Sequence, residues 1–548
     1  MTAELITTVP EAVSARTAKS YGSYIAGKNV EGHEWVHVIT PRAMLDDSFA
    51  SFTLKRRLDS GEAEFAEAAD IVAGRVAVAD DAMITQTLTH AAAAARQWRS
   101  QPLSVRVDGY IDLLREALLD NREAIVEMLT LEGHPRDLAK WEFSGFLSGT
   151  RSESKEFLRE QLWRESRTNG RRQIVRRQPD GVVCVNPPAN APMSSILLSS
   201  LALCAGNAVV FRVPRSVPLG AMFAVHELIG PVLDQLGAPT GTVGAICGNP
   251  APVLDVWLRH EAVDDIMYFG SSTNGLKFEQ DCVAAGKKPV LELAGNDTVL
   301  VWKDANLDYV VQALVESFYG SGQLCMIPNR VVAHPAIADD LIDLLAAAAR
   351  KLRPGYPDEE GVLLSPVLRQ DGFFDCLADA VAKGAEIVTG GKGMAIDGSQ
   401  DTAGFFLEPT VLRVDGLDHS KTLAAVEHET FFPLLPVVVP RFADDASLLD
   451  DFIDFINSNL YGLRNSIWAS DERVVDRVVS NVVNGGLLKV NDSHIAFSAP
   501  LPTHGGTGRT GGAFGQANYP ALSTSHLQGV SILDGSVAPN YAAEYPHA

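Results

Sequence analysis

One cysteine lies in a glycine-rich loop that suits covalent chemistry. Residues 319–330 place two glycines shortly before Cys325 and lead into the apolar pair Val331 and Val332. A thiolate attacks carbonyl carbon well, and flanking glycines let backbone N–H groups close on the oxyanion that forms. The alternative is that Cys325 is a small buried hydrophobe, as single cysteines usually are. The loop therefore predicts either a nucleophile that a ligand can reach or a packing residue.

A carboxylate that precedes this cysteine in the chain favours the first interpretation. Residues 289–296 form an apolar, strand-like run that delivers Glu292 into a turn containing Gly295. Together the two stretches resemble the aldehyde dehydrogenase superfamily, whose nucleophile lies in a Gly-Gln-x-Cys loop and whose general base lies in a Glu-Leu-Gly-Gly turn. Ala294 replaces one of those glycines here. The resemblance implies that Cys325 is the nucleophile and that Glu292 is the general base.

Length, charge and composition limit the class of protein. The chain has 548 residues, 46% of them hydrophobic, so it can bury a large core and should hold two or three structural domains. Its 46 basic and 68 acidic residues give a net charge of −22, which argues against nucleic acid or an anionic membrane as a partner. Residues 1–30 lack a signal-peptide pattern, and no apolar stretch reaches the roughly 18 residues of a membrane span. We expect a cytoplasmic protein.

The cysteines favour a reducing compartment. The six are far apart in the sequence, without a Cys-x-x-Cys pair or a His/Cys cluster of zinc spacing. Reduced thiols are therefore expected, and no metal site is indicated. The cysteines are residues 184, 204, 247, 282, 325 and 376.

The region between residues 181 and 295 alternates short apolar strands with helices. This alternation is typical of a parallel, doubly wound sheet with crossover helices, whose ligands bind at the carboxyl ends of the strands. The expected strands are 182–185, 208–213, 243–247, 266–269 and 290–293. The expected helices are 193–204, 219–236, 251–260 and 272–285. Outside this region we expect helices at 83–98, 107–121, 122–133, 336–352 and 372–383, and strands at 386–389 and 406–412.

A turn with two glycines follows one of these strands. Gly270, Ser271 and Gly275 lie where strand 266–269 gives way to a helix, so free N–H groups and the helix dipole face any phosphate placed there. A tight strand-to-helix turn explains the spacing equally well. The segment resembles the superfamily's Gly-Ser-Thr-x-x-Gly pyrophosphate site, with Ser272 in place of the threonine. The resemblance implies that Gly270, Ser271 and Gly275 bind the pyrophosphate of a cofactor.

A proline-rich segment also matches the superfamily. Residues 187–192 resemble its Pro-Trp-Asn-x-Pro segment, which brings an asparagine amide to the reacting carbonyl. The resemblance implies that Asn190 is the second oxyanion donor beside the Cys325 backbone N–H, and that Pro188 contacts the cofactor. Taken alone, these residues also fit an ordinary Pro/Asn turn.

Two arginines bear on the choice of cofactor. Residues 206–215 resemble the strand that ends in the superfamily's ribose-binding Lys-Pro-Ser-Glu turn, with Arg212 in place of the lysine. Arg215 stands at the position that is often acidic in NAD users. A carboxylate there would repel a 2′-phosphate, whereas an arginine forms charge-assisted hydrogen bonds with it. We therefore expect NADP as the preferred cofactor and NAD as the alternative.

A third segment would complete the nicotinamide site. Residues 428–434 resemble the superfamily's Glu-Glu-Ile-Phe-Gly-Pro-Val segment. The resemblance implies that Glu429 holds the hydroxyls of the nicotinamide ribose and that Phe431 packs beside the ring. An acidic residue before an apolar strand is otherwise common loop decoration.

The resemblance covers residues 20–530 and implies an α/β fold of three parts. These are a Rossmann-like doubly wound parallel sheet that binds the cofactor, an α/β catalytic domain, and a small β arm that joins subunits into a homodimer or homotetramer. The basic stretch 164–180 also fits a solvated hairpin, and residues 31–61 are expected to be a surface elaboration. We assign residues 1–163 and 181–291 to the cofactor domain, 292–500 to the catalytic domain, and 164–180 and 501–548 to the arm and tail.

The implied activity is that of an NAD(P)-dependent aldehyde dehydrogenase acting through a thiohemiacetal and a thioester on Cys325. A CoA-acylating aldehyde dehydrogenase or thioester reductase would use the same cysteine but tends to lack a carboxylate at position 292. A catalytically silent binding relative is the other alternative. Ala189 and Ala191 replace bulky aromatic residues of relatives around Asn190. This difference predicts a wide pocket and a bulky or aromatic aldehyde as the small-molecule partner.

Overall fold

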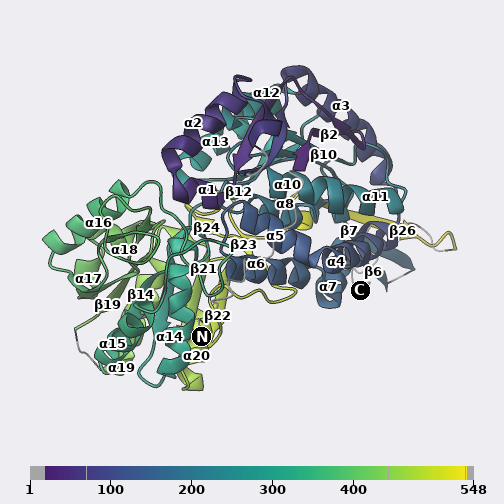
Figure 1. The fold of residues 1–548 in the computed structure, drawn as a ribbon. Coiled ribbons are helices and arrows are strands. Elements are labelled where there is room, and N and C mark those ends of the chain that lie inside the picture. Colours follow the sequence, from purple (N-terminus) through teal and green to yellow (C-terminus); the bar gives the residue numbers. More distant parts are fainter. Residues whose placement is uncertain (1–18, 69–70, 169, 442–443, 537–538, 540–548) are drawn as a thin grey trace, which may run out of the picture.

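The computed structural model describes residues 19–68, 71–168, 170–441, 444–536 and 539. The expected assignments of residues 1–18 to the cofactor domain and of 537–538 and 540–548 to the tail fall outside this part. Figure 1 shows two bodies side by side, one from the purple-to-teal part of the chain and one from the green part. The short strands β23 (His504–Gly505) and β24 (Thr507–Gly508) lie between them.

A ten-stranded sheet organises the first body. Seven strands follow one another in parallel across it, and β2 (Ser23–Ile25), β3 (Lys28–Val30) and β4 (Glu34–Ile39) are attached beside them. In spatial order the seven are β1 (Lys19–Tyr21), β5 (Val72–Val78), β10 (Val243–Cys247), β9 (Ala208–Val213), β8 (Val182–Asn186), β11 (Asp265–Phe269) and β12 (Lys288–Glu292).

The central strands of this sheet are buried on both faces, as their near-continuous apolar runs predict. Successive side chains of a strand point to opposite faces, so each strand contributes to two cores. In β8, Val183 and Val185 lie in the core on one face of the sheet, whereas Val182 and Cys184 lie in the core on the other face. The doubly wound parallel sheet predicted from the alternating pattern is therefore confirmed.

The expected helices of the first body are present, with ends shifted by a few residues. The helix expected at 193–204 is broken into α8 and α9, and the one expected at 219–236 is interrupted by a π-helical turn at Ala224–Ile229. The helices are α3 (Asp81–Trp98), α4 (Tyr110–Asp120), α5 (Arg122–Leu131), α6 (Arg136–Gly149), α7 (Ser152–Leu162), α8 (Pro192–Ser199), α9 (Ala202–Ala205), α10 (Leu219–Phe223), α11 (Gly230–Gln235), α12 (Pro250–Arg259) and α13 (Ser272–Ala284).

The segment 31–61 is more than the surface elaboration expected for it. Its β4 pairs antiparallel along the whole of β5, and α1 (Pro41–Asp46) and α2 (Ser48–Asp59) follow. Leu58 of α2 packs with Ile39 and Val72, so the helix covers the added edge of the sheet with a small core of its own. The segment is therefore an elaboration at the edge of the sheet, and it has a small core because the apolar run in β4 needs both a pairing strand and a cover.

A seven-stranded sheet organises the second body. Its parallel core begins with β13, directly after the turn that follows β12, and one antiparallel strand, β15, closes an edge. The spatial order is β15 (Glu386–Thr389), β18 (Thr410–Asp415), β19 (Leu434–Val439), β14 (Pro328–Ala333), β13 (Asp297–Val301), β21 (Arg464–Trp468) and β22 (Leu487–Val490). The main helices are α14 (Leu307–Val315), α15 (Ala338–Ala349), α16 (Asp371–Ala382), α19 (Asp445–Asn457) and α20 (Glu472–Asn481).

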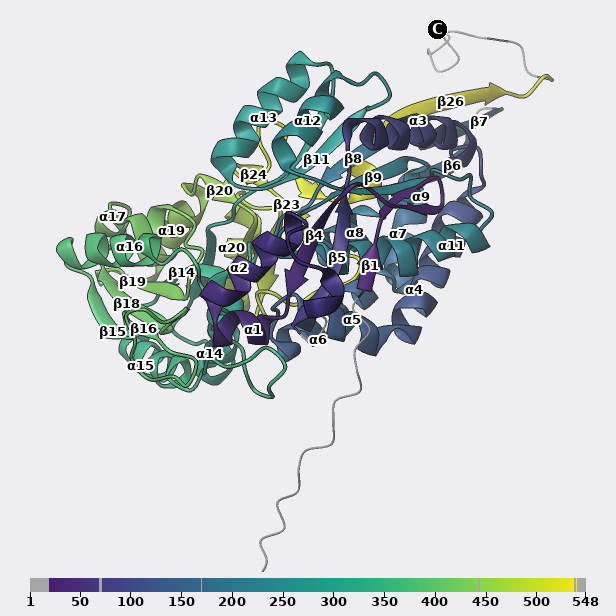
Figure 2. The same ribbon diagram turned by 45° about the horizontal axis from the view of Figure 1, so that its top comes forward.

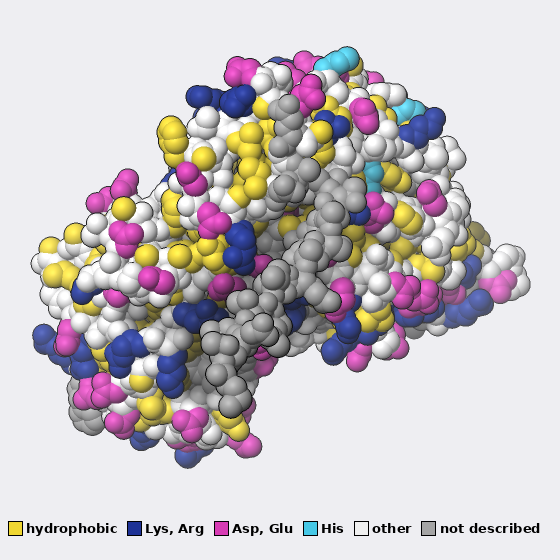
Figure 3. All heavy atoms as spheres, viewed as in Figure 1, with side chains coloured by type: hydrophobic (Ala, Val, Ile, Leu, Met, Phe, Trp, Pro, Cys, Tyr) yellow, Lys and Arg dark blue, Asp and Glu magenta, His cyan; other side chains and the backbone are white. Residues whose placement is uncertain are grey.

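A third, three-stranded sheet projects from the first body. Figure 2 shows β26 (Ser525–Leu533) running outward beside β7 (Arg171–Pro179), and β6 (Trp163–Thr168) completes the sheet in the order β26-β7-β6. Within the described part of the chain, no helix has both the length and the apolar character needed to cross a membrane. Figure 3 shows Lys and Arg side chains interspersed with Asp and Glu across one face of the molecule.

Candidate active site

A tunnel walled by both bodies reaches Cys325. It has a volume of about 1340 Å³ with its open mouth included, and Asn190 and Cys325 both lie in its wall. Of the described residues that line it, none is Lys, Arg or Asp, and Glu142 supplies the only carboxylate. Its aromatic side chains are Trp141, Phe146, Phe157, Phe269, Phe497 and Tyr519. Most of the wall is thus apolar, although serine, threonine and asparagine side chains also line it.

The segment around Asn190 reaches the tunnel only in part. Pro188, Asn190 and Ala191 line it, whereas Ala189 is exposed and lies outside the lining. The expectation that both alanines enlarge the pocket was therefore wrong for Ala189, because the chain turns there and directs that residue to solvent. The Asn190 side-chain amide donates to the Gln323 carbonyl oxygen at 3.0 Å, which fixes it beside the cysteine loop.

The loop before Cys325 follows an uncommon backbone path. Gly320, Ser321 and Gly322 all have positive φ, at 59°, 56° and 73°. A Cβ on Gly322 would lie 2.4 Å from the Phe432 carbonyl oxygen, so that position requires glycine. The Ser321 hydroxyl holds the strained residue in place by donating to the Ser365 carbonyl oxygen at 2.6 Å. The loop is thereby held rigidly against the second body.

The thiol is not acidic in this environment. Burial, and then the negative charge of Glu429, raise the pKa of Cys325 to about 12, with Arg464 acting in the opposite direction. The dry surroundings of Cys325 disfavour its charged form, so the protonated thiol prevails in this structure. A base must take the thiol proton when the sulfur attacks.

Glu292 ends β12 and is held by two hydrogen bonds. The Gly505 backbone N–H donates to Glu292 Oε2 at 2.6 Å, and the Asn518 side-chain amide donates to Oε1. Burial raises the pKa of Glu292 to about 7, while these two bonds act in the opposite direction. Glu292 is 5% exposed, and Asn518 lies in the tunnel wall in front of it. A carboxylate with a pKa near neutrality suits a general base.

The expected phosphate turn lies at the carboxyl end of β11. Ser271 caps α13 by accepting the Asn274 backbone N–H at 3.4 Å, and the N–H groups of the first helical turn point out of the helix. A Cβ on Gly275 would lie 2.1 Å from Leu293 Cδ2, so only glycine lets α13 approach the segment after β12 this closely. Gly270 and Ser271 precede the helix at the same strand end. These features fit the pyrophosphate of a dinucleotide.

Arg212 and Arg215 differ in what they can offer a cofactor. Arg212 is 6% exposed, and it donates to Asn186 Oδ1 at 2.5 Å, the Gly248 carbonyl at 3.0 Å and the Pro187 carbonyl at 3.1 Å. It therefore ties together the ends of β8, β9 and β10. Arg215 is half-buried and donates no hydrogen bond to any residue that the structure describes.

A lysine from the added segment joins Arg215 near the end of β10. Burial raises the pKa of Cys247 to about 12, and the positive charges of Arg215, Arg212 and Lys55 oppose that shift. Lys55 lies on α2 and donates to Asp59 Oδ2 at 3.1 Å. Sequence reasoning missed it because nothing in residues 31–61 resembles a cofactor motif.

Glu429 lies close to the nucleophile in this structure. Its Oε1 accepts the Gly295 backbone N–H at 3.0 Å, and burial raises its pKa to about 8. Phe431 is 36% exposed, so its ring keeps an accessible face. The structure thus brings Glu429, Glu292 and Cys325 into one electrostatic neighbourhood.

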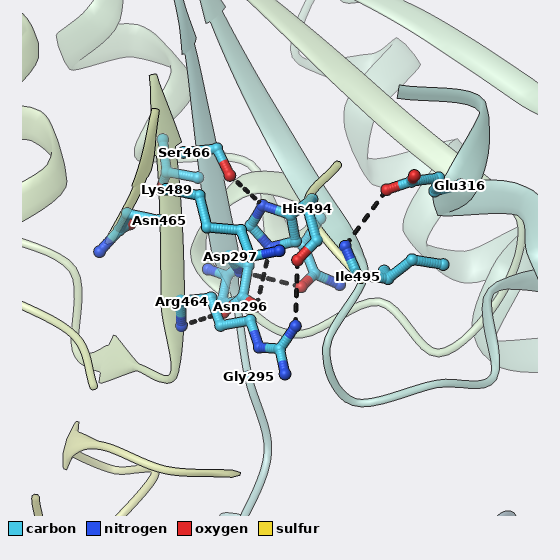
Figure 4. A network of polar contacts seen from close by, with 12 residues as sticks. Gly295, Asn296, Asp297, Glu316, Arg464, Asn465, Ser466, Lys489, His494 and Ile495 are labelled. Atoms are coloured by element: carbon cyan, nitrogen blue, oxygen red, sulfur yellow. Dashed lines mark hydrogen bonds and ion pairs between the residues drawn. The ribbon is translucent and has the colours of Figure 1, made fainter. Parts of the chain in front are cut away.

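A buried polar network supports the turn after Glu292 (Figure 4). Asp297 Oδ1 accepts the Arg464 backbone N–H at 3.1 Å, and Asp297 Oδ2 lies 3.1 Å from His494 Nε2. His494 Nδ1 lies 2.6 Å from Ser466 Oγ, and Arg464 donates to the His494 carbonyl at 3.0 Å. The network joins β13, β21 and the loop after β22. No motif in the sequence signals it, since its members pair only through the tertiary fold.

Comparisons with known proteins agree with this geometry. The model of the aldehyde dehydrogenase family matches residues 60–528. Glutarate-semialdehyde dehydrogenase of Pseudomonas aeruginosa is 30% identical over 428 residues, covering 76% of this chain and 83% of that protein. Benzaldehyde dehydrogenase YfmT of Bacillus subtilis is 27% identical over 474 residues, covering 83% of this chain and 90% of that protein.

A solved structure shares the whole fold. The crystal structure of aldehyde dehydrogenase 21 from Physcomitrella patens in complex with the reaction product succinate superposes with a TM-score of 0.77 at 23% identity, covering 95% of this chain and 100% of that one. The sheets, the tunnel and the family match lead to one conclusion. The chain belongs to the aldehyde dehydrogenase family and is an NAD(P)-dependent oxidoreductase that converts an aldehyde into a carboxylic acid.

Proposed function

We propose that this enzyme oxidises neutral, bulky or aromatic aldehydes, that it prefers NADP, and that it works through a thioester on Cys325. The apolar tunnel carries the proposal. A free carboxylate brought into such a wall loses its hydration without gaining a cationic partner, which costs several kcal/mol. The glutarate-semialdehyde relative acts on an anionic aldehyde, so its substrate does not transfer to this chain. The benzaldehyde relative acts on a substrate of the kind that the aromatic wall would accept.

The catalytic groups have separate roles in this scheme. The Cys325 sulfur bonds to the aldehyde carbon and gives up its proton to a base, and the oxyanion receives hydrogen bonds from Asn190 and the Cys325 backbone N–H. A bound nicotinamide would supply the hydride acceptor that oxidation of the thiohemiacetal to the thioester requires. Water then attacks the thioester carbon while Glu292 takes a proton from that water. Collapse of the tetrahedral adduct releases the acid and the Cys325 sulfur.

The cofactor preference rests on the cations near the end of β10. Arg215 has donors that are not used by described protein groups, and Lys55 adds a second positive charge near Cys247. Two cations suit the dianionic 2′-phosphate of NADP. Gly270, Ser271 and Gly275 would hold the pyrophosphate, Pro188 and Arg212 would shape the adjoining wall, and Glu429 with Phe431 would hold the nicotinamide ribose and ring.

The arm supports a homodimer or homotetramer. Both edge strands of its sheet, β26 and β6, lack a second neighbour within the described part of the chain. Leu527 and Val175 on this sheet are 64% and 51% exposed, which is apolar surface that a second subunit would cover. Light scattering on the eluting peak of a sizing column should give two or four subunit masses for the full chain, and Leu527→Glu should lower that mass.

One substrate series tests the proposed function. Benzaldehyde, methyl 4-formylbenzoate and 4-carboxybenzaldehyde share a ring, and only the last carries a charge. We expect kcat/KM for the ester to be close to that for benzaldehyde, and kcat/KM for the carboxylate to be about 100-fold lower, since about 3 kcal/mol of unrecovered desolvation corresponds to that factor. Equal kcat/KM for ester and carboxylate would contradict the neutral-substrate proposal.

The same assay separates the competing activities. Free CoA should leave the rate unchanged and yield no acyl-CoA, because Glu292 is present to activate water. Acyl-CoA formation would instead indicate a CoA-acylating enzyme. If no aldehyde in an aliphatic and aromatic panel reduces NAD or NADP, the chain is a catalytically silent relative.

A further inference from the structure

A short helix of the added segment contacts both bodies. α1 follows β4 and lies at the border between the two bodies in Figures 1 and 2. On one side, Ala43 and Met44 pack against the small core at the edge of the first sheet. On the other side, Leu45 packs against a buried apolar cluster of the second body. That cluster consists of Leu364, Met394 and Phe406.

Polar contacts at the surface join the same two parts. Arg42 donates to Asp358 Oδ1 at 3.1 Å, and its guanidinium carbon lies 3.8 Å from the centre of the Tyr356 ring. The Tyr356 hydroxyl donates to Asp46, which lies one turn along α1 from Arg42. The Arg42 and Asp358 side chains are 50% and 53% exposed, and exposed ion pairs contribute little alone. We therefore expect the packing of Leu45 to contribute more than the ion pair.

The partner of α1 is a loop without regular secondary structure. Residues 350–370, all of which the structure describes, form no helix or strand. A loop of this length keeps one conformation through contacts with its surroundings. The first body supplies another contact at the start of α6, where the Arg136 backbone N–H donates to the Pro357 carbonyl at 2.8 Å. The first body thus holds residues 356–366 at two places.

The same loop holds the stretch 320–323 that precedes Cys325. Three donors of this stretch bond to carbonyl groups in residues 363–366. The pairs are the Gly320 N–H with Leu363 at 2.8 Å, the Ser321 hydroxyl with Ser365 at 2.6 Å, and the Gln323 side-chain amide with Pro366 at 3.0 Å. Leu364 lies among these acceptors and belongs to the cluster that Leu45 contacts. Contacts therefore run without a gap from α1 to the loop of the nucleophile.

The stretch 320–323 also fixes the second group that would meet the aldehyde. The Gln323 carbonyl accepts the Asn190 side-chain amide at 3.0 Å. A shift of Gln323 would therefore move Asn190 together with Cys325. Both positions depend on the loop that α1 contacts.

We propose that α1 is a positioning element for the nucleophile, with Leu45 and Arg42 as its positioning residues. They hold residues 356–366 from the first body, and those residues hold the stretch 320–323. This inference rests on the proposed role of Cys325 as the nucleophile. A reacting atom misplaced by about 1 Å can cost about 100-fold in rate, so loosening this support should be measurable. The added segment then serves catalysis as well as packing.

Leu45→Ala tests the proposal, with Leu54→Ala as the matched control. Leu54 lies on α2 and packs against the small core of the first body, so the same truncation is made on the other side of the segment. Both variants should lower the melting temperature. At saturating aldehyde and cofactor, Leu45→Ala should slow the burst of reduced cofactor about tenfold, whereas Leu54→Ala should stay within about twofold of wild type. Arg42→Ala removes only exposed contacts and should slow the burst about two- to threefold, which gives a reading if Leu45→Ala does not fold.

Hydrogen exchange follows the loop of the nucleophile without any substrate. The Gly320 amide is protected by its bond to Leu363, so peptides that cover residues 318–326 report on this contact. Leu45→Ala should speed exchange in these peptides about tenfold, and Leu54→Ala should leave it unchanged. If the wild-type enzyme reduces no cofactor with any aldehyde, the proposed function fails, and the exchange result still decides whether α1 holds the loop.

Ser321→Ala tests the route, because it removes the hydrogen bond to Ser365. If α1 acts through this bond, the double variant Leu45→Ala/Ser321→Ala should be at most about twofold slower in the burst than the slower single variant. Fully multiplied effects would overturn the route. An unchanged burst and unchanged exchange in Leu45→Ala would overturn the proposal. Equal losses in Leu45→Ala and Leu54→Ala would also overturn it, since both would then report only on the stability of the first body.

Discussion

Replacing Glu292 by glutamine should separate catalysis from stability in a single variant. The substitution keeps the size of the side chain and one acceptor oxygen. That oxygen can take the Gly505 N–H, which now bonds Glu292 Oε2 at 2.6 Å. The new NH2 group would face Asn518, whose unpartnered Oδ1 can accept from it after a half-turn of the amide. We therefore expect Glu292→Gln to fold with its local hydrogen bonds intact.

The magnitudes follow from the buried position of Glu292. A pKa raised from 4.5 to about 7 corresponds to about 3 kcal/mol of destabilisation of the ionised side chain. Because the folded pKa lies above the unfolded one, the stability that Glu292 contributes at low pH is lost as pH rises from about 4.5 to about 7. Glutamine has no such loss. The free energy of unfolding of Glu292→Gln relative to that of wild type should therefore rise between pH 4.5 and about pH 7 and stay constant above that pH.

Catalysis should change in the opposite sense. Loss of a positioned general base costs roughly 10²- to 10⁴-fold, or about 3–5 kcal/mol of barrier. Glu292→Gln should bind cofactor and complete the first hydride transfer, then stop at the thioester. The assay is stopped-flow absorbance of the reduced cofactor, which should show a stoichiometric burst, followed by mass spectrometry of the acylated Cys325. Melting temperatures at pH 5 and pH 8.5 supply the stability comparison.

Normal steady-state turnover of Glu292→Gln would refute the assignment of the base. Glu429 would then be the next candidate, because its pKa is raised to about 8 and its charge acts on Cys325. A melting temperature well below that of wild type at pH 8.5 would refute the stability argument, since it would mean that the amide cannot rearrange as described.

Three further variants test other parts of the site. Arg215→Glu should lower kcat/KM for NADP relative to NAD by about 10- to 100-fold, since a charge-assisted hydrogen bond worth about 1.5–3 kcal/mol is lost; an unchanged ratio would show that Arg215 does not contact the 2′-phosphate. Cys325→Ser should give neither a burst nor an acyl adduct, because serine is a far weaker nucleophile without a dedicated base, and any retained burst would remove Cys325 from the mechanism. Gly275→Ala would place a Cβ 2.1 Å from Leu293 Cδ2, so cofactor affinity measured by fluorescence titration should fall about tenfold as α13 is displaced, whereas unchanged affinity would show that Leu293 can move aside.

Local patterns in the sequence were enough for the fold class. Strands 182–185, 208–213 and 243–247 appear as β8, β9 and β10 within a residue of their expected ends. Their Val-rich runs can only be buried between two helical layers, and this constraint is readable without the structure. The strand β4 within residues 31–61 was not predicted from the sequence, because its formation depends on pairing with β5, a separate segment of the chain.

What the sequence by itself determined was the identity of the chemical groups: a cysteine after a glycine-rich loop, a carboxylate at a strand end, and the family to which they belong. The tertiary structure decided how those groups behave. It sets the pKa of Cys325 and Glu292 through burial, encloses Arg212 in hydrogen bonds to the ends of β8 and β10, and places Asn518 against Glu292. Charge, desolvation and tunnel polarity depend on which side chains meet in space, and segments hundreds of residues apart supply them here.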